Sequence, residues 1–212
     1  MTDREKSSTE EFRIAHATDL DPDGGIAFAH SVGLARRGGG TLVSLHANPD
    51  TEDAIRRMPE ASELMAEWAL RGGAPVDEEV DFEKVVHTCC DDPVDTLLDA
   101  MRDVEPNLLV VGKHPTEGVF QFLHDSVAES LALNAEIPAL FLPIGGRGFV
   151  DEVTGDFTLD RVMIPAEDEA TFLAVYEVLS GLLERLSIED VDIVLFHVGD
   201  DDVLDNLVIP EG

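Results

Sequence analysis

Apolar and polar positions over the first 145 residues form short apolar runs separated by amphipathic segments. Apolar runs at 12–17, 41–47 and 108–112 have the length of buried strands, and turn-forming residues bound them. The segments between them carry apolar residues at three- and four-residue spacing, which is typical of helices with one face against a sheet. The pattern predicts strands and helices in alternation.

Three segments show the helical spacing. The first follows Asp19 and the DPDGG turn and runs through Arg37, and the Gly38–Gly40 run ends it because glycine readily adopts a left-handed cap. The second is predicted as one long helix from about residue 51 to Leu70. The third begins with Pro93 in its first turn. The inward-facing stripes of the last two are Ile55, Met58, Ala61, Met65 and Trp68, and Val94, Leu97, Leu98, Met101 and Val104.

The stretch over 80–90, third in chain order, is a further strand candidate with a different pattern. Apolar Val80, Phe82 and Val85 are interleaved with charged residues, which indicates a half-exposed edge strand. Five strands in alternation with four helices, with nearly continuous apolar central strands, specify the α/β class. We expect an open parallel five-stranded sheet with helices on both faces and right-handed crossovers.

The chain repeats its own opening after Pro143. RVMIPAED (161–168) corresponds to RIAHATDL (13–20), and VDIVLFHVGD (191–200) corresponds to TLVSLHANPD (41–50). A helical stripe lies between them, formed by Phe172, Val175, Leu179, Leu182 and Leu186. We therefore predict a disordered tail over 1–10, a domain over 11–145, a linker over 146–158 and a partial second repeat (strand, helix, strand) over 159–212.

Charge excludes several classes of partner. Asp and Glu total 45 against 14 Lys and Arg, which leaves a net charge of −31. Nucleic acid and anionic membrane surfaces are bound through basic residues, so neither is an expected partner. Only Lys6, Lys84 and Lys113 are lysines. Scarce lysine with abundant acid suits a cytosol of molar salt, so we predict a halophilic protein whose acidic surface serves solvation.

The compartment follows from the cysteines and from apolar run lengths. Cys89 and Cys90 are adjacent, and neighbours on a strand point to opposite faces, so they do not form an unstrained disulfide. The first residues lack the apolar centre of a signal peptide, and no run of 18 apolar residues occurs. We predict a soluble, cytoplasmic protein.

The stretch from Leu108 to Pro143 reads LLVVGKHPTEGVFQFLHDSVAESLALNAEIPALFLP: strand, loop, Ser-initiated helix and strand. It resembles the C-terminal half of a universal stress protein domain, whose pattern is a strand, G-x2-G-x9-G-[ST], a helix and a strand ending in proline. Gly112 keeps the first glycine and Ser126 the hydroxyl, whereas Pro115 and Asp125 occupy the other two glycine positions. The resemblance implies strand order 3-2-1-4-5 and a tandem type with an incomplete second copy.

The resemblance also implies a ligand crevice at the carboxyl ends of strands one and four. In members that bind ATP, the acid after strand one contacts ribose and adenine, the end of strand two lines the adenine pocket, and loop amides hold the phosphates. These roles carry over, by resemblance, to the residues at matching positions: Asp19, Ala47, Val111, Gly112, Ser126 and Val127.

The altered loop predicts impaired ATP binding. Pro115 has no N–H to offer a phosphate, and Asp125 places a carboxylate beside it. Like charges at ~4 Å cost ~1 kcal/mol even in bulk water. Glu117 adds to this repulsion, while Lys113, His114 and His124 could offset part of it. Intact ATP binding, a different anion and a metal-bridged nucleotide remain alternatives.

Several candidate residues also have purely structural interpretations. Asp19 could form the turn before the first helix, and Ser126 with Glu129 matches a capping box. His16 and His46 lie within or at the ends of buried strands, so we interpret them as hydrogen-bonded core histidines. A metal site from His87, Cys89, Cys90 and His114 is not predicted, because zinc ligand spacings are absent.

Catalysis has no support in the motifs. The sequence lacks G-x-S-x-G, G-x4-G-K-[ST], G-x-G-x-x-G after strand one and H-E-x-x-H. Cys90 with His87 is not placed by spacing alone to act as a nucleophile pair. We predict a non-catalytic, cytoplasmic stress-response domain. It would form a homodimer, through the strand over 138–142, or pair its repeats within the chain. The alternatives are an ATP-binding switch using the 112–126 loop, and a nucleotide hydrolase depending on Asp19 or Ser126.

Overall fold

The structure is a computed structural model of the chain and describes residues 11–73, 79–88, 92–114 and 127–197. The chain divides into two compact units, 1–156 and 157–212, which we describe separately. None of the described helices combines the length and apolar character needed to cross a membrane.

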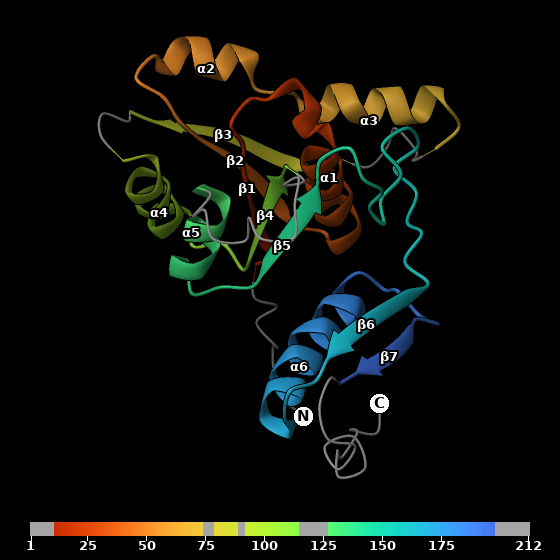
Figure 1. Cartoon of the computed structure of the whole chain (residues 1–212). Coiled ribbons are helices and arrows are strands. Elements are labelled where there is room, and N and C mark those ends of the chain that lie inside the picture. Colours follow the sequence, from red (N-terminus) through yellow and green to blue (C-terminus); the bar gives the residue numbers. More distant parts are fainter. Residues whose placement is uncertain (1–10, 74–78, 89–91, 115–126, 198–212) are drawn as a thin grey trace, which may run out of the picture. The chain divides into compact units, whose positions relative to one another are not determined.

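The first unit is built on a five-stranded sheet with strand order β3-β2-β1-β4-β5 (Figure 1). All four pairings are parallel. The predicted order and class are confirmed, and β3 is the edge strand that its alternating pattern predicted. The strands are β1 (Arg13–Ala17), β2 (Thr41–Ala47), β3 (Asp81–His87), β4 (Leu108–Lys113) and β5 (Ala139–Pro143).

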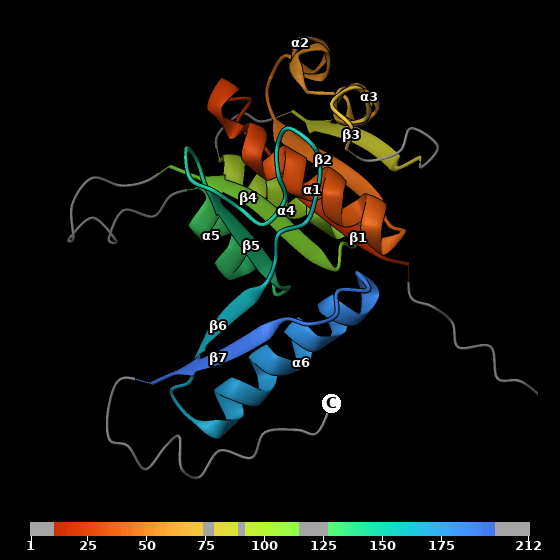
Figure 2. The ribbon, with the colours of Figure 1, turned by 90° about the vertical axis from the view of Figure 1, so that its right-hand side faces the viewer.

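Helices cover both faces of this sheet (Figures 1 and 2). A short 3-10 turn, η1 (Pro22–Gly24), leads into α1 (Gly25–Gly38), which packs on β1 and β4. The opposite face carries α4 (Pro93–Val104) and α5 (Val127–Asn134). Their apolar side chains form one core with those of the central strands: Ala15, Val43, Leu45, Leu97, Ala100, Met101, Val104, Leu109, Val111 and Leu131.

The predicted long helix after β2 is wrong. The structure has two helices, α2 (Thr51–Arg57) and α3 (Ala61–Leu70), separated at Met58 and Pro59. Met58 is extended, with ψ of 136°, because the ring of a following proline disfavours helical backbone. The predicted inward stripe is nevertheless buried at Met58, Ala61, Met65 and Trp68, and only its first residue, Ile55 on α2, is exposed, at 42%.

The Gly38–Gly40 run ends α1 as predicted. Gly39 has φ of 61°, the left-handed conformation that favours glycine. Gly40 has a second reason to be glycine: a Cβ there would lie 2.4 Å from the carbonyl oxygen of Phe12. The turn thus stops the helix and lets the chain enter β2 close beside β1.

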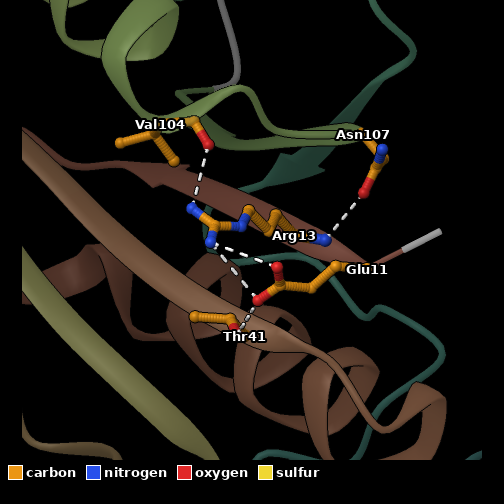
Figure 3. Close-up of polar contacts among 5 residues, drawn as sticks. All are labelled: Glu11, Arg13, Thr41, Val104 and Asn107. Carbon is orange, nitrogen blue, oxygen red and sulfur yellow. Dashed lines mark hydrogen bonds and ion pairs between the residues drawn. The ribbon is translucent and has the colours of Figure 1, made fainter.

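Arg13 ties the amino ends of three strands together (Figure 3). Its backbone N–H donates to Asn107 Oδ1 at 2.7 Å, and its guanidinium donates to the Val104 carbonyl at 3.3 Å and to the Glu11 carboxylate. Thr41 Oγ1 in turn donates to Glu11 Oε1 at 3.5 Å. This network lies at the end of the sheet opposite the carboxyl ends of the strands.

The segment over 144–156 packs on α1 and α3 of the first unit. Val150 N–H donates to His30 Nε2 at 3.0 Å, and Trp68 Nε1 donates to the Glu152 carbonyl at 3.0 Å. Arg36 donates to the Gly155 carbonyl at 3.2 Å. Residues 146–156, which we expected to be part of a linker, therefore belong to the first unit.

The second unit is a strand, a helix and a strand, the order that the sequence pattern predicts. β6 (Arg161–Pro165) pairs in parallel with β7 (Asp192–Phe196), and α6 (Glu169–Arg185) connects them. α6 packs on one face of the two-stranded sheet. The core between them consists of Ile164, Ala166 and Phe172 with the partly buried Val162, Tyr176, Leu179 and Leu195.

The two units pair their strands in the same register. In the first unit Arg13 lies opposite Thr41, and in the second Arg161 lies opposite Asp192. In both, the pairing continues for five residues. The sequence correspondence of RIAHA with RVMIP is thus also a correspondence of position in a parallel strand pair.

The backbone beyond the strand pairs matches as well. Thr18 N–H donates to the Leu45 carbonyl at 3.0 Å, and its counterpart Ala166 donates to the Phe196 carbonyl at 2.8 Å. Both bonds join the residue that follows the first strand to the second strand. The first strand therefore leaves the pair in the same way in both units.

A histidine follows this bond in each unit. His46 Nδ1 donates to the Thr18 carbonyl at 2.6 Å, and His197 Nδ1 donates to the Ala166 carbonyl at 2.7 Å. His46 lies in β2, and His197 directly follows β7. Each histidine donates to the residue that directly follows the first strand of its pair. The side-chain contact is thus repeated along with the backbone.

The helices of the two units also end alike. The residue after α1, Gly39, has φ of 61°, and Ser187, two residues after α6, has φ of 50°. Ser187 adopts this left-handed conformation without being glycine, at a cost of roughly 1 kcal/mol. In both units the helix is thus followed by a left-handed residue before the second strand.

Candidate functional site

A cavity of about 110 Å³ opens at the carboxyl ends of β1 and β4. It lies where the strand order reverses, the position at which open α/β sheets bind ligands. Four predicted site residues line it: Asp19, Val111, Gly112 and Val127. Ala47 is not among the described residues that line it, and packs instead against the core beneath α4. Ser126, Pro115 and Asp125 lie outside the described residues.

In the segment after β1, three side-chain oxygens each accept a hydrogen bond from the backbone N–H two residues further along the chain. Leu20 N–H donates to Thr18 Oγ1 at 3.1 Å, Asp21 N–H to Asp19 Oδ1 at 3.0 Å, and Asp23 N–H to Asp21 Oδ1 at 2.9 Å. Leu20 has φ of 63°, a left-handed conformation that is strained for a leucine. Asp19 thus forms a turn, the structural role left open by the sequence, while its exposed side chain borders the cavity.

Asp19, Asp21 and His114 bring three ligand-type atoms within 4.8 Å of one another. His114 Nε2 lies 3.3 Å from Asp21 Oδ2. Carboxylate oxygens and imidazole nitrogen are ligands of divalent metals, so the group could hold a cation. Sequence reasoning missed this group. The available signal was that β1 and β4 are neighbours, so that residues directly after them meet.

An ion pair stands at the end of β4. Lys113 Nζ contacts Glu129 Oε1 from the first turn of α5, and both side chains are about 70% buried, with exposures of 30% and 26%. We expected Lys113 to offset acidic charge in the following loop and Glu129 to complete a capping box. The pairing neutralises the lysine beside the site, and the capping box with Ser126 falls on a residue outside the described ones.

Ile144 closes the cavity beside Gly112. A Cβ at Gly112 would lie 3.3 Å from Ile144 Cδ1, and Ile144 N–H donates to the Lys113 carbonyl at 2.9 Å. Ile144 is 8% exposed. The sequence analysis did not select this residue, because it lies beyond the last strand and only the β4–β5 pairing brings it to the loop.

His16 and His46, close to the crevice, are hydrogen-bonded structural residues. His16 is buried, with Nδ1 3.1 Å from Ser44 Oγ. Burial lowers the pKa of His16 to about 4, against an opposing effect of the Asp19 charge. His46 donates to the Thr18 carbonyl. Their hydrogen bonding agrees with the core interpretation of both residues.

Comparison with known families matches residues 12–143 to the universal stress protein family. The matched range is more than half of the 212 residues. The chain belongs to the universal stress protein family. Residues beyond 143, including the whole second unit, lie outside the matched range.

Solved structures of universal stress proteins are similar to this chain. One in complex with cAMP has 18% sequence identity and a TM-score of 0.45, over 63% of this chain and 98% of its own. One from Archaeoglobus fulgidus has 24% identity and a TM-score of 0.42, over 61% and 97%. The Archaeoglobus fulgidus protein in complex with dAMP has 22% identity and a TM-score of 0.41, over 61% and 96%. The search of curated proteins found no match.

Proposed function

We propose that this universal stress protein is a non-catalytic, cytoplasmic stress-response domain whose crevice binds ATP weakly. The observation that carries the proposal is the small crevice at the ends of β1 and β4, which has Asp19 in its lining and Asp21 beside Asp19. Three features support it: the volume of the cavity, the charge around it and the chemistry of the loop after β4.

The volume is the first. The cavity holds about 110 Å³, whereas pockets for drug-sized ligands hold roughly 300–1,000 Å³. Ile144 limits it on the Gly112 side. A triphosphate nucleotide would need this wall to move, and the buried isoleucine would lose apolar contacts in doing so.

The charge is the second. Asp19 and Asp21 stand at the mouth, and the nearest lysine, Lys113, is already paired with Glu129. A phosphate entering here meets the carboxylates of these two residues, and at ~4 Å each such pair of like charges costs ~1 kcal/mol or more.

The loop after β4 is the third. Its sequence adds the carboxylates of Glu117 and Asp125, and Pro115 offers no N–H to a phosphate.

Catalysis is disfavoured by the burial of the one nucleophile–base pair that the described hydrogen bonds contain. Ser44 Oγ lies 3.1 Å from His16 Nδ1, which resembles an activated serine. Both residues are within the sheet, at 0% and 2% exposure, so a substrate cannot reach the hydroxyl. We infer that this pair stabilises the core. A hydrolase would instead show phosphate release that Asp19→Ala or Ser126→Ala abolishes.

An ATP-binding switch is the second candidate. It is favoured by the convergence of Asp19, Val111, Gly112 and Val127 on one cavity, since these are the positions that contact ATP in binding members of the family. A divalent cation on Asp19, Asp21 and His114 could bridge these acids to phosphate oxygens. This candidate requires the altered loop to function despite its charge.

Titration calorimetry with Mg²⁺ and ATP in molar KCl separates the two. We expect no heat of binding up to millimolar ATP. Micromolar affinity would overturn the proposal and favour the switch. Because protein without a functional fold also gives no heat, circular dichroism of the same sample is recorded alongside.

Restoring the loop glycines tests the cause. Pro115→Gly with Asp125→Gly should increase ATP affinity at least tenfold if these two residues disable the site. Asp103→Asn removes one negative charge from the exposed side of α4 and serves as the charge control. No gain in the double variant would assign the weak binding to the cavity itself.

We also propose that this protein forms a homodimer through β5. This strand is the edge opposite β3, and an edge strand presents unpaired backbone groups to a partner. Phe141 in its middle is 38% exposed. Phe141→Asp is expected to weaken such pairing, as measured by light scattering.

A further inference from the structure

The two-stranded sheet of the second unit has one covered face and one open face. Side chains alternate along a strand, so Val162 and Ile164 on β6 point to α6 while their neighbours point away. We call the opposite set the open face: Met163, Pro165, Val194 and Phe196. Met163 is 61% exposed, Val194 38% and Phe196 48%.

The corresponding side chains of the first unit are buried. By strand register, Met163, Val194 and Phe196 occupy the positions of Ala15, Val43 and Leu45. Those three are 0–1% exposed. The side chains on the open face are at least as large as their buried counterparts, so their exposure leaves more apolar surface in water.

In the first unit the corresponding face is covered by a helix. Leu97 and Met101 of α4 share one core with Ala15, Val43 and Leu45. Parallel strands are almost always covered on both faces, and two strands with a bare face are marginal alone. Within the described residues of the second unit, α6 covers only the other face. The open face therefore needs a cover.

Charge favours a second copy of the same chain as that cover. With a net charge of −31, two copies repel each other over most of their surface. Within β6 and β7 the open side carries no net charge, because their charged residues, Arg161 and Asp192, form an ion pair at 3.0 Å. An apolar face flanked by one positive and one negative side chain is self-complementary, as a twofold interface requires.

A helix from another first unit is a poorer candidate for the cover. α4 is already packed on β1, β2 and β3 of its own sheet. Its buried side chains, Leu97, Met101 and Val104, are part of that core. Moving α4 to the second unit would expose the first sheet, so the exchange gains nothing.

We propose that two copies of this chain pack the open faces of their second units against each other across a twofold axis. The result is a small sandwich of two strand pairs, at the ~10 Å spacing of stacked sheets. This interface is separate from the β5 pairing, so a chain that uses both assembles beyond a dimer, and it does not depend on whether the crevice binds ATP.

Light scattering and sedimentation equilibrium in molar KCl test the interface. The measurements use the full chain with Phe141→Asp, which weakens the β5 pairing. We expect this variant to remain dimeric at tens of micromolar protein, and Phe141→Asp with Phe196→Asp to have the mass of a monomer. The two substitutions are matched, since each replaces an exposed phenylalanine of a strand by an aspartate.

Two further results complete the test. Met163→Asp in the Phe141→Asp background should also give a monomer, and circular dichroism shows whether each variant keeps its folded signal. If the Phe141→Asp protein is monomeric at every concentration, the open face is covered by something other than a second copy, and the proposal is overturned. A dimer that survives both Phe196→Asp and Met163→Asp overturns it as well.

Discussion

His30 Nε2 accepts a hydrogen bond from the N–H of Val150 at 3.0 Å, across 120 residues of sequence. Because Nε2 is the acceptor, Nδ1 carries the proton and donates to the Ile26 carbonyl at 2.8 Å. The ring also meets Phe149 edge-on, with centroids 4.8 Å apart. A neutral histidine on α1 thus holds the segment after β5.

Acidification should weaken this arrangement. Burial lowers the pKa of His30, and it lowers that of His16 to about 4. The unfolded chain, with histidine pKa near 6.5, then binds more protons than the native one, so the free energy of unfolding falls as pH decreases from 6.5 toward 4. For His16 alone the loss amounts to about 3 kcal/mol.

Urea unfolding at pH 7.5 and pH 5 measures how much His30 contributes to the pH dependence of the free energy of unfolding. His30→Leu should be less stable at pH 7.5 by about 1–3 kcal/mol, because Val150 N–H loses its acceptor. It should also lose less stability than the parent on going to pH 5. Equal pH dependence in parent and His30→Leu would contradict the assignment.

Gly155 should not tolerate a side chain. Its φ is 73°, and a Cβ would lie 2.4 Å from Trp68 Cε3. We expect Gly155→Ala to destabilise the protein by about 2–4 kcal/mol, from backbone strain and overpacking together. Gly72→Ala is the matched control, since Gly72 has φ of 81° but nothing within 4 Å of the added Cβ. Chemical denaturation should show the smaller loss, about 1 kcal/mol, for the control.

Glu105 is a site where a glycine should stabilise the protein. It is exposed, follows α4, and adopts φ of 50° and ψ of 57°. Glu105→Gly should raise the free energy of unfolding by about 1 kcal/mol, because glycine adopts the left-handed cap without strain. Glu105→Gln removes the same charge without relieving the backbone. If both variants stabilise equally, charge rather than conformation explains the effect.

The acidic surface predicts a dependence on salt. With 45 acidic against 14 basic residues, the folded chain concentrates negative charge that the unfolded chain spreads out. Raising salt from 0.1 to 1 M shortens the Debye length from ~10 Å to ~3 Å and relieves this repulsion. The melting temperature should rise steeply between dilute buffer and molar KCl. A flat response would refute the halophilic interpretation, and sucrose at equal osmolality controls for effects other than screening.

Local patterns were sufficient where the physics is local. The α1 stop at Gly39, the start of α4 at Pro93 and the edge character of β3 were all predicted from side-chain spacing and turn chemistry. The same reasoning failed over 51–70, where the apolar stripe continues in phase across Pro59. There the backbone restriction before proline outweighed the helical periodicity, and Met58 became extended.

The residues of the candidate site likewise fall into those that the sequence could place and those that it could not. Asp19, Val111 and Gly112 could be placed together because residues at the ends of neighbouring parallel strands share one edge of a sheet. Ile144 and the Lys113–Glu129 pair could not, because their positions depend on how β5 returns and how α5 is seated. The size and charge of the crevice therefore came only from the structure.

The sequence by itself determined the alternation of strands and helices, the acidic surface and the likeness of 161–168 to 13–20, since each follows from composition or residue order without knowing which distant residues meet. The tertiary structure alone decided which distant residues meet. It placed Val150 on His30 and Ile144 beside Gly112. It also left Phe196 exposed where its counterpart Leu45 is buried. These outcomes depend on packing between segments up to 120 residues apart, which no local pattern encodes.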